Sequence, residues 1–160
     1  MHLIVGADHA GFRLKESIVP ELRSWGHEVD DLGCYTEIPV DFPDIARLVC
    51  HSVREHEGAR GLLVCGTGAG AGIAANKIAG IRAAVCHDVH SAHQAVEHDD
   101  VNVLCLGAQI VGEWLAYDLI RTFCEATFEV REPFLRRLAL LRELERESAR
   151  EILGPRDDWS

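Results

Sequence analysis

The sequence predicts an α/β fold of three layers, in which a five-stranded parallel sheet carries helices on both faces and an extended helix closes the chain. Three observations indicate this fold. Short apolar runs alternate with helical segments, the runs are continuously apolar, and glycine-rich or polar turns follow them. Continuously apolar strands are typical of parallel sheets whose two faces are both covered by helices.

Five apolar runs predict the strands of this sheet. They cover residues 3–7, 27–33, 61–65, 81–86 and 103–107, and the second is the weakest of them. The carboxyl ends of parallel strands meet at one edge of a sheet, where ligands bind near a switch in strand order. We therefore expect four turns to gather at that edge: Asp8-His9, residues 65–72, His87-Asp88 and the turn that begins at Gly107.

Helical spacing of apolar residues predicts helices at 12–25, 44–57, 73–79, 91–98, about 112–126 and about 133–151. Pro20 should kink or shorten the first helix, and Gly26 should end it. The last helix has a leucine stripe and few other elements to cover it. We therefore expect it to pack on a partner subunit.

The composition fits one globular domain and argues against several partners. The chain has 160 residues, 48% of them hydrophobic and 26% charged. Its formal net charge of −10 argues against nucleic acid or an anionic membrane as the main partner. No apolar run reaches the ~18 residues of a membrane span, no secretion signal opens the chain, and the six cysteines form no CxxC pair. We expect a reduced, cytoplasmic protein with one domain over 1–151 and a polar tail over 152–160.

The stretch with the most chemical content follows the third strand. Cys65 ends that strand, glycines alternate from Gly66 to Gly72, and helix-forming residues come next. Glycines let backbone N–H groups approach an anion closely, and a helix N-terminus adds roughly half a positive charge. A thiol in this field ionises more easily, so Cys65 is a candidate base or nucleophile.

Two interpretations of this stretch involve a cofactor or a metal. A dinucleotide-binding turn matches Gly66-x-Gly68-x-x-Ala71, with Asp88 about 20 residues later as the acid that would bind a ribose. A metal site is suggested by five further residues, although their spacing is loose and a solvated histidine-rich face explains them better. These residues are His87, Asp88, His90, His93 and His98.

The third interpretation is an enzyme whose base is Cys65. Interconversion of an aldose and a ketose needs a base that moves a proton between C1 and C2. It also needs donors that stabilise the enediolate formed between them. The Cys65 thiolate would supply the base, and the backbone N–H groups of the glycine turn would supply the donors.

Several longer motifs resemble those of the type B ribose-5-phosphate isomerases and the related galactose-6-phosphate isomerase subunits. The resemblance implies a Rossmann-like fold, an isomerase without metal or cofactor, and a homodimer or homotetramer with sites at a subunit interface. Ribose 5-phosphate and ribulose 5-phosphate become the default substrates. The motifs are Gly6-Ala7-Asp8-His9-Ala10-Gly11-Phe12, Val64-Cys65-Gly66-Thr67-Gly68, Ile73-Ala74-Ala75-Asn76-Lys77, Gly80-Ile81-Arg82-Ala83, Glu97-His98 and Asn102-Val103-Leu104.

The same resemblance implies roles for individual residues. Cys65 would be the base, Thr67 would assist proton movement at the sugar oxygens, and His98 would open the furanose ring. Asp8 and His9 would hold the sugar. The anion hole would consist of backbone amides between Gly66 and Gly72, including those of Gly68 and Gly70.

Several substrate-binding positions depart from the family's pattern. Phe42 stands where the family has tyrosine, Asp99 where it has asparagine, and Gln109 where it has arginine. Pro133 takes the place of a second arginine, so that Arg137 remains, with Arg136 beside it.

These departures affect the phosphate end of the substrate. Charge-assisted contacts to a phosphate contribute roughly 1.5–3 kcal/mol each. The arginines are missing at positions 109 and 133, and the carboxylate of Asp99 repels an anion. Phosphate binding should therefore be weaker unless Arg131 or another cation substitutes. A different sugar of four to six carbons, phosphorylated or not, is therefore an open alternative. So are a sugar sensor without turnover and a nucleotide-binding domain.

Overall fold

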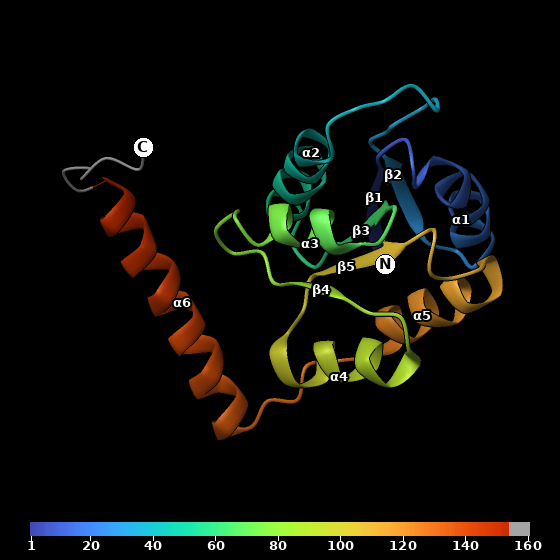
Figure 1. Cartoon of the computed structure of the whole chain (residues 1–160). Helices are drawn as coiled ribbons and strands as arrows, with labels where there is room; N and C mark the ends of the chain where they lie inside the picture. Colours follow the sequence, from blue (N-terminus) through green and yellow to red (C-terminus); the bar gives the residue numbers. More distant parts are fainter. Residues whose placement is uncertain (154–160) are drawn as a thin grey trace. The chain divides into compact units, whose positions relative to one another are not determined.

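The computed structural model describes residues 1–153, which divide into two compact units. The first, residues 1–128, contains the sheet, and the second begins at Glu129 and contains the last helix (Figure 1). Residues 152 and 153 of the expected polar tail belong to that helix, and the remaining tail lies outside the described residues. The single domain expected over 1–151 stays a prediction.

The five predicted strands form one parallel sheet. Its order is β2-β1-β3-β5-β4, with β1 at His2–Ala7, β2 at Glu28–Asp31, β3 at Arg60–Cys65, β4 at Ala83–Val85 and β5 at Val103–Gly107. The chain leaves β1 toward β2 and returns to β3 on the other side of β1, so the strand order reverses between β1 and β3. The turns that follow these two strands therefore flank the switch point.

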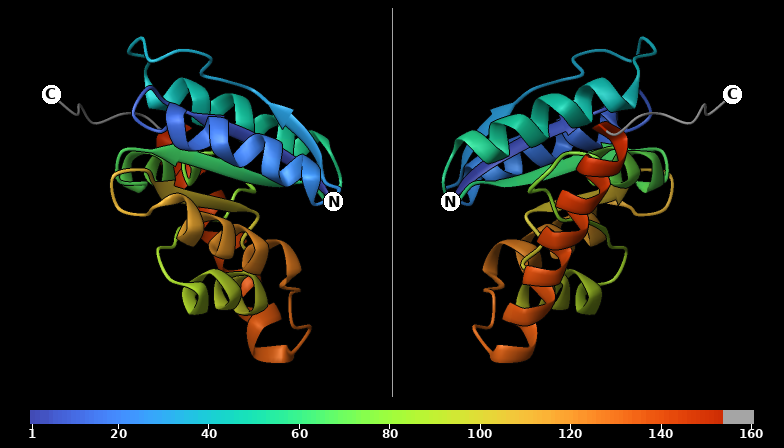
Figure 2. Two further views of the ribbon diagram at one scale, coloured as in Figure 1. Left: turned by 90° about the vertical axis from the view of Figure 1, so that its right-hand side faces the viewer. Right: turned by 90° about the vertical axis from the view of Figure 1, so that its left-hand side faces the viewer.

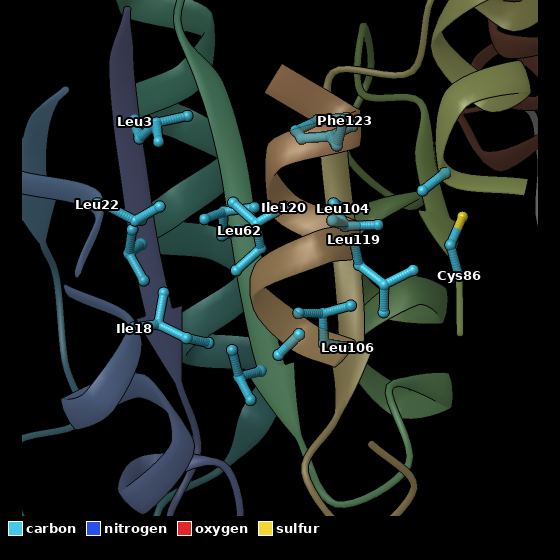
Figure 3. Close-up of a cluster of buried hydrophobic side chains, with 14 of the residues drawn as sticks. Leu3, Ile18, Leu22, Leu62, Cys86, Leu104, Leu106, Leu119, Ile120 and Phe123 are labelled. Carbon is cyan, nitrogen blue, oxygen red and sulfur yellow. The ribbon is translucent and has the colours of Figure 1, made fainter. Parts of the chain in front are cut away.

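Helices cover both faces of this sheet, as the sequence predicts. On one face α1 (Phe12–Ser24), α4 (Val89–Asp99) and α5 (Glu113–Glu125) pack on the strands, and on the other α2 (Phe42–Glu55) and α3 (Ala69–Ala75) do so (Figure 1). The first face buries the larger cluster of apolar side chains. Figure 3 shows Leu3, Leu62 and Leu104 of the strands meeting Ile18 of α1 and Phe123 of α5.

The first helix corrects one expectation. It continues through Pro20 to Ser24 and is not shortened there. Pro20 is exposed, so the carbonyl of Glu16, whose i→i+4 bond the proline removes, is close to solvent. Gly26 follows the helix with a φ of +85°, which confirms that it ends the helix in the left-handed conformation.

Helices α2, α3 and α4 each begin two or more residues earlier than predicted. Helix α2 begins at Phe42, because Pro43 lacks an N–H that the first turn does not need. Helix α3 begins at Ala69, directly after Gly68, and ends at Ala75. The sequence predicts that it begins only at residue 73. Gly70 and Gly72 thus lie inside α3. An added Cβ would be 3.2 Å from the Phe42 ring at Gly70 and 2.9 Å from Val85 at Gly72, so tight packing explains glycines in this helix.

The second unit consists mainly of helix α6, Glu132–Leu153. Figure 2 shows it as one continuous helix. Leu141 and Leu144 are among its exposed apolar residues. Its packing on a partner subunit stays a prediction. Among the described helices, none is long and apolar enough to cross a membrane.

Gly11 provides a test of how tightly the first turn packs on β3. A Cβ at this position would overlap the carbonyl oxygen of Val64. We expect Gly11→Ala to lower the free energy of unfolding by about 3 kcal/mol, because the backbone of β3 cannot move aside. Urea unfolding measures the change. Gly112→Ala is the control, since nothing lies within 4 Å of its Cβ position, and it should cost about 1 kcal/mol or less. Equal losses in the two variants would contradict this account.

Candidate active site

The thiol of Cys65 lies at the carboxyl end of β3 and receives a backbone hydrogen bond. The N–H of Gly68 donates to its Sγ atom at 3.0 Å. Gly68 has a φ of +81°, a conformation in which L side chains are strained, and this turn directs its N–H back toward the sulfur. The Cys65 side chain is 5% exposed, so the hydrogen bond is shielded from water.

The other five cysteines lack this environment. Burial raises the pKa of the Cys50 thiol to about 12 and that of Cys86 to about 11. It also raises the pKa of Cys34, Cys105 and Cys124. All five are therefore protonated near neutral pH. Four of them are buried, and Cys124 is partly buried against the core.

The turn after β5 packs on the loop that carries Cys65. The N–H of Ala108 donates to the Cys65 carbonyl at 2.8 Å, and the N–H of Gln109 donates to the Gly66 carbonyl at 2.9 Å. A Cβ on Gly107 would lie only 2.7 Å from the carbonyl carbon of Thr67, so the two backbones are in direct contact. The Gln109 side chain lies beside Gly66, with Oε1 3.4 Å from the position of an added Cβ.

The turn after β1 brings Asp8 and His9 to the same edge. The Asp8 N–H donates to the carbonyl of Val64 on β3 at 3.2 Å. Its buried carboxylate accepts from the N–H groups of Ala10 and Gly11 at 2.9 and 3.0 Å through Oδ1. Asp8 thus fixes the start of α1, in addition to the sugar contact that the sequence predicts for it. His9 is exposed, and its Nδ1 accepts from the Val40 N–H at 3.4 Å.

The remaining nearby positions line the first turn of α3. Thr67 is exposed, and its Oγ1 accepts from the Ala69 N–H at 3.4 Å. The first i→i−4 bond of this helix runs from the Gly72 N–H to the Gly68 carbonyl at 2.9 Å, so the N–H of Gly70 precedes it. The Phe42 ring packs on Gly70. This part of the site therefore combines backbone donors with an apolar wall.

His98 and Asp99 lie at the opposite edge of the sheet from Cys65. They end α4, and Arg82, which precedes β4, donates from Nε to the Asp99 carbonyl at 3.1 Å. Five steps along β3 at about 3.3 Å each separate the two edges by ~16 Å. Within one chain, His98 and Asp99 therefore do not join the site that contains Cys65. The resemblance implies a site at a subunit interface, and the joint role of His98 and Asp99 with Cys65 stays a prediction.

The predicted phosphate cations belong to the second unit. Arg131 pairs with Glu129 at 2.7 Å and Arg136 with Glu132 at 3.5 Å. The guanidinium of Arg137 lies 5.8 Å from the centre of the Phe134 ring. Their contact with the substrate stays a prediction.

The residues that suggested a nucleotide or a metal have other contacts. Asp88 is the N-cap of α4 and accepts from the Ser91 N–H at 2.7 Å, which lowers the pKa of its carboxyl. His93 and His98 both lie near the carboxylate of Glu97. Among the residues that the structure describes, no three His, Cys, Asp or Glu side chains are grouped so that they could hold a metal ion.

Sequence reasoning missed the contact of His87. Its Nε2 accepts from the N–H of Gly107 at 3.0 Å, next to the loop that carries Cys65. The sequence gives one signal for it, because a polar ring directly after a predicted strand belongs to the carboxyl edge of the sheet.

Comparisons with known proteins agree on one family. The family model described as Ribose/Galactose Isomerase matches residues 3–141. Ribose-5-phosphate isomerase B of Escherichia coli is 44% identical over 124 residues, which cover 78% of this chain and 83% of that protein. D-erythrulose-4-phosphate isomerase of Pectobacterium atrosepticum is 39% identical over 131 residues, 81% of this chain and 86% of that protein. The solved structure of ribose-5-phosphate isomerase B from Clostridium thermocellum superposes with a TM-score of 0.90 at 40% identity, covering 92% of this chain and 99% of that one.

Variants of Asp8 separate its structural contacts from its charge. Asp8→Ala removes the acceptor of two backbone N–H groups, and we expect the free energy of unfolding to fall by about 1–2 kcal/mol. Asp8→Asn keeps one carbonyl oxygen as acceptor and should lose less than about half of that. Urea unfolding measures both, with exposed Asp118→Ala on α5 as the control. Equal destabilisation by alanine and asparagine would show that the charge, and not the acceptor, stabilises this turn.

Proposed function

This chain belongs to the ribose/galactose isomerase family, and from that premise we propose that it interconverts ribose 5-phosphate and ribulose 5-phosphate through an enediolate. One observation carries the proposal. The Sγ of Cys65 lies at the switch point of the sheet and accepts the N–H of Gly68 at 3.0 Å. The sulfur thus has a backbone donor beside it, and a thiolate at this place is the base that this reaction needs.

The reaction moves one proton between two neighbouring carbons. The Cys65 thiolate takes the proton from C2 of the open-chain aldose, and the resulting thiol returns it to C1. Between these steps the negative charge lies on the enediolate oxygens. Backbone N–H groups of the turn from Gly66 to Gly70, other than the Gly68 N–H that faces the Cys65 sulfur, stabilise it. The exposed hydroxyl of Thr67 moves the proton between the O1 and O2 atoms. No electrons leave the substrate, so the chemistry itself needs no redox cofactor.

A second copy of the chain completes the site in this proposal. Ring opening is the role expected of His98, which lies at the opposite edge of the sheet from Cys65 within one chain, about one strand length (~16 Å) away. A homodimer or homotetramer can place the His98–Asp99 edge of one subunit against the Cys65 edge of another. The edge strand β4 supports such an interface, because Val85 and Ile73 are exposed apolar residues that line a groove of about 510 Å³.

The residues around the base decide which sugar is used. The backbone of Gln109 is fixed on Gly66, while its neutral side chain offers a phosphate no charge. In the proposed assembly, Asp99 would accept hydrogen bonds from sugar hydroxyls and repel an anion. A four-carbon sugar phosphate is the second candidate, because a relative that is 39% identical is named D-erythrulose-4-phosphate isomerase. Arg136 and Arg137, or Arg131, would then supply the cations that bind the phosphate.

We also propose a reducing, cytoplasmic location for this enzyme. All six cysteines are free, and a catalytic thiolate has to remain reduced to act as a base. The net charge of −10 makes nucleic acid and anionic membranes unfavourable partners compared with a small sugar.

A substrate panel tests the reaction and its substrate together. Ribose 5-phosphate, erythrulose 4-phosphate and unphosphorylated ribose are incubated in deuterated water, and exchange of the C1 and C2 protons is followed by NMR. We expect exchange with ribose 5-phosphate, and Cys65→Ala should lower kcat about 1,000-fold because it removes the group that takes the C2 proton.

The control in this experiment is Cys124→Ala, which removes a thiol outside the site and should leave exchange unchanged. A Cys65→Ala enzyme that is folded and retains turnover would rule out the proposed base. Faster exchange of erythrulose 4-phosphate would keep the mechanism and replace the substrate. Saturable binding without any exchange would indicate a sugar sensor.

Mixing two inactive variants tests whether the site is shared between subunits. Cys65→Ala and His98→Ala chains are each expected to be inactive as pure proteins. After unfolding and refolding together, half of the dimers contain one of each, and one of their two sites is intact, so activity should return to about a quarter of wild type. Activity that stays at the level of the pure variants would place both residues in the same subunit's site.

A further inference from the structure

We propose that His87 is a positioning residue of this isomerase, which holds the turn 107–109 in place and thereby fixes the donor that faces the Cys65 thiolate. The inference rests on the proposed function for its activity assay, but its geometry stands independently. His87 does not touch the reacting atoms. It acts through the backbone of Gly107 and Gly68.

The ring of His87 is anchored from both sides along the chain. Before it, the Cys86 N–H continues the sheet by donating to the Cys105 carbonyl at 3.3 Å. After it, Asp88 caps α4. His87 is half-buried between these anchors, and its Nε2 accepts from the Gly107 N–H at 3.0 Å. A neutral imidazole with an accepting Nε2 carries its proton on Nδ1, so this contact also fixes the tautomer.

A continuous chain of contacts leads from this ring to the thiol. Gly107 has its backbone against that of Thr67, where an added Cβ would be 2.7 Å away. Gly68 faces the same turn, since its own Cβ position lies 3.2 Å from the carbonyl carbon of Leu106 and 3.4 Å from the N atom of Gly107. The N–H of Gly68 then donates to the Cys65 sulfur. Because neither glycine has a side chain that could yield, a shift at Gly107 moves Gly68 directly.

Loss of the His87 acceptor would affect the chemistry more than binding. The Gly107 N–H would be left in a shielded turn without its partner, and the turn would move to find one. The substrate contacts expected of Asp8 and His9 are on a different turn, after β1, and remain as they are. Gln109 lies on the turn that moves, but its neutral side chain offers a phosphate no charge. The effect should therefore appear in kcat and in the reactivity of the thiol, with little change in KM.

The test compares His87→Phe, which keeps a ring but has no acceptor, with His87→Gln, whose side-chain oxygen can accept at a similar reach. The control is His90→Phe, an exposed residue in the first turn of the same helix. We expect His87→Phe to lower kcat about tenfold to a hundredfold with KM within about twofold. His87→Gln should return kcat to within about threefold of wild type, and His90→Phe should leave it unchanged.

A second readout needs no turnover. The rate at which iodoacetamide alkylates Cys65, followed by mass spectrometry of its peptide, should fall in His87→Phe and recover in His87→Gln. This measurement distinguishes the two proposals. If the substrate panel shows no isomerisation but alkylation follows this order, the positioning role stands and the proposed function fails.

Two results would overturn the inference. One is a folded His87→Phe enzyme with wild-type kcat and alkylation rate. The other is a His87→Gln enzyme as impaired as His87→Phe, which would show that the ring's packing matters and not its acceptor. Thermal unfolding identifies a variant that does not fold. If His87→Phe does not fold, His87→Ala is used in its place, and we expect the same losses of kcat and of alkylation rate.

Discussion

The hydrogen bond from the Gly68 N–H to the Cys65 sulfur is the contact on which the site depends. It requires a left-handed residue directly after a buried strand, and glycine meets that requirement at little cost. It also requires the turn after β5 to lie in van der Waals contact with the backbone of Thr67, which is possible because Gly107 has no side chain. Gly11 does the same for the turn after β1. The switch point is thus formed by three backbones that approach more closely than any side chain would allow.

A parallel sheet imposes a second constraint, because it separates the two ends of each strand–helix unit. Turns that follow strands gather at the carboxyl edge, and the helices return the chain to the amino edge. Asp8 follows β1 and Cys65 ends β3, so both lie at the carboxyl edge, whereas His98 lies at the end of a returning helix. If the reaction needs both Cys65 and His98, a single copy of this fold cannot supply them at one place. Oligomerisation would then be a requirement of the chemistry as well as a means of covering apolar surface.

The sequence predicts the sheet and its edge well, because both follow from local patterns. Continuous apolar runs identified the five strands, and residues such as Asp8 and Gln109 could be placed at the carboxyl edge from their position after a strand. The predicted start of α3 was wrong, because glycines favour a turn in the local sequence. Their place inside the helix is explained only by the packing of Phe42 and Val85 on them. The contact of His87 depends on β4 lying beside β5, which is a long-range property. Local patterns place His87 at the carboxyl edge but do not identify the Gly107 N–H as its partner.

Backbone hydrogen bonds hold the loop that carries Cys65, whereas side chains determine what a substrate meets around it. The N–H of Gln109 would bond the Gly66 carbonyl whatever side chain followed, and the N–H of Ala108 does the same for Cys65. Replacing an arginine by glutamine at position 109 can therefore alter the charge that a substrate meets without moving the base. The same holds for Phe42, whose ring contacts Gly70 through its carbon atoms and needs no hydroxyl to do so. Such a loop can keep the same proton-transfer chemistry while the side chains around it, such as those at positions 42 and 109, change. That is consistent with relatives of similar identity to this chain being named for a five-carbon and a four-carbon sugar phosphate.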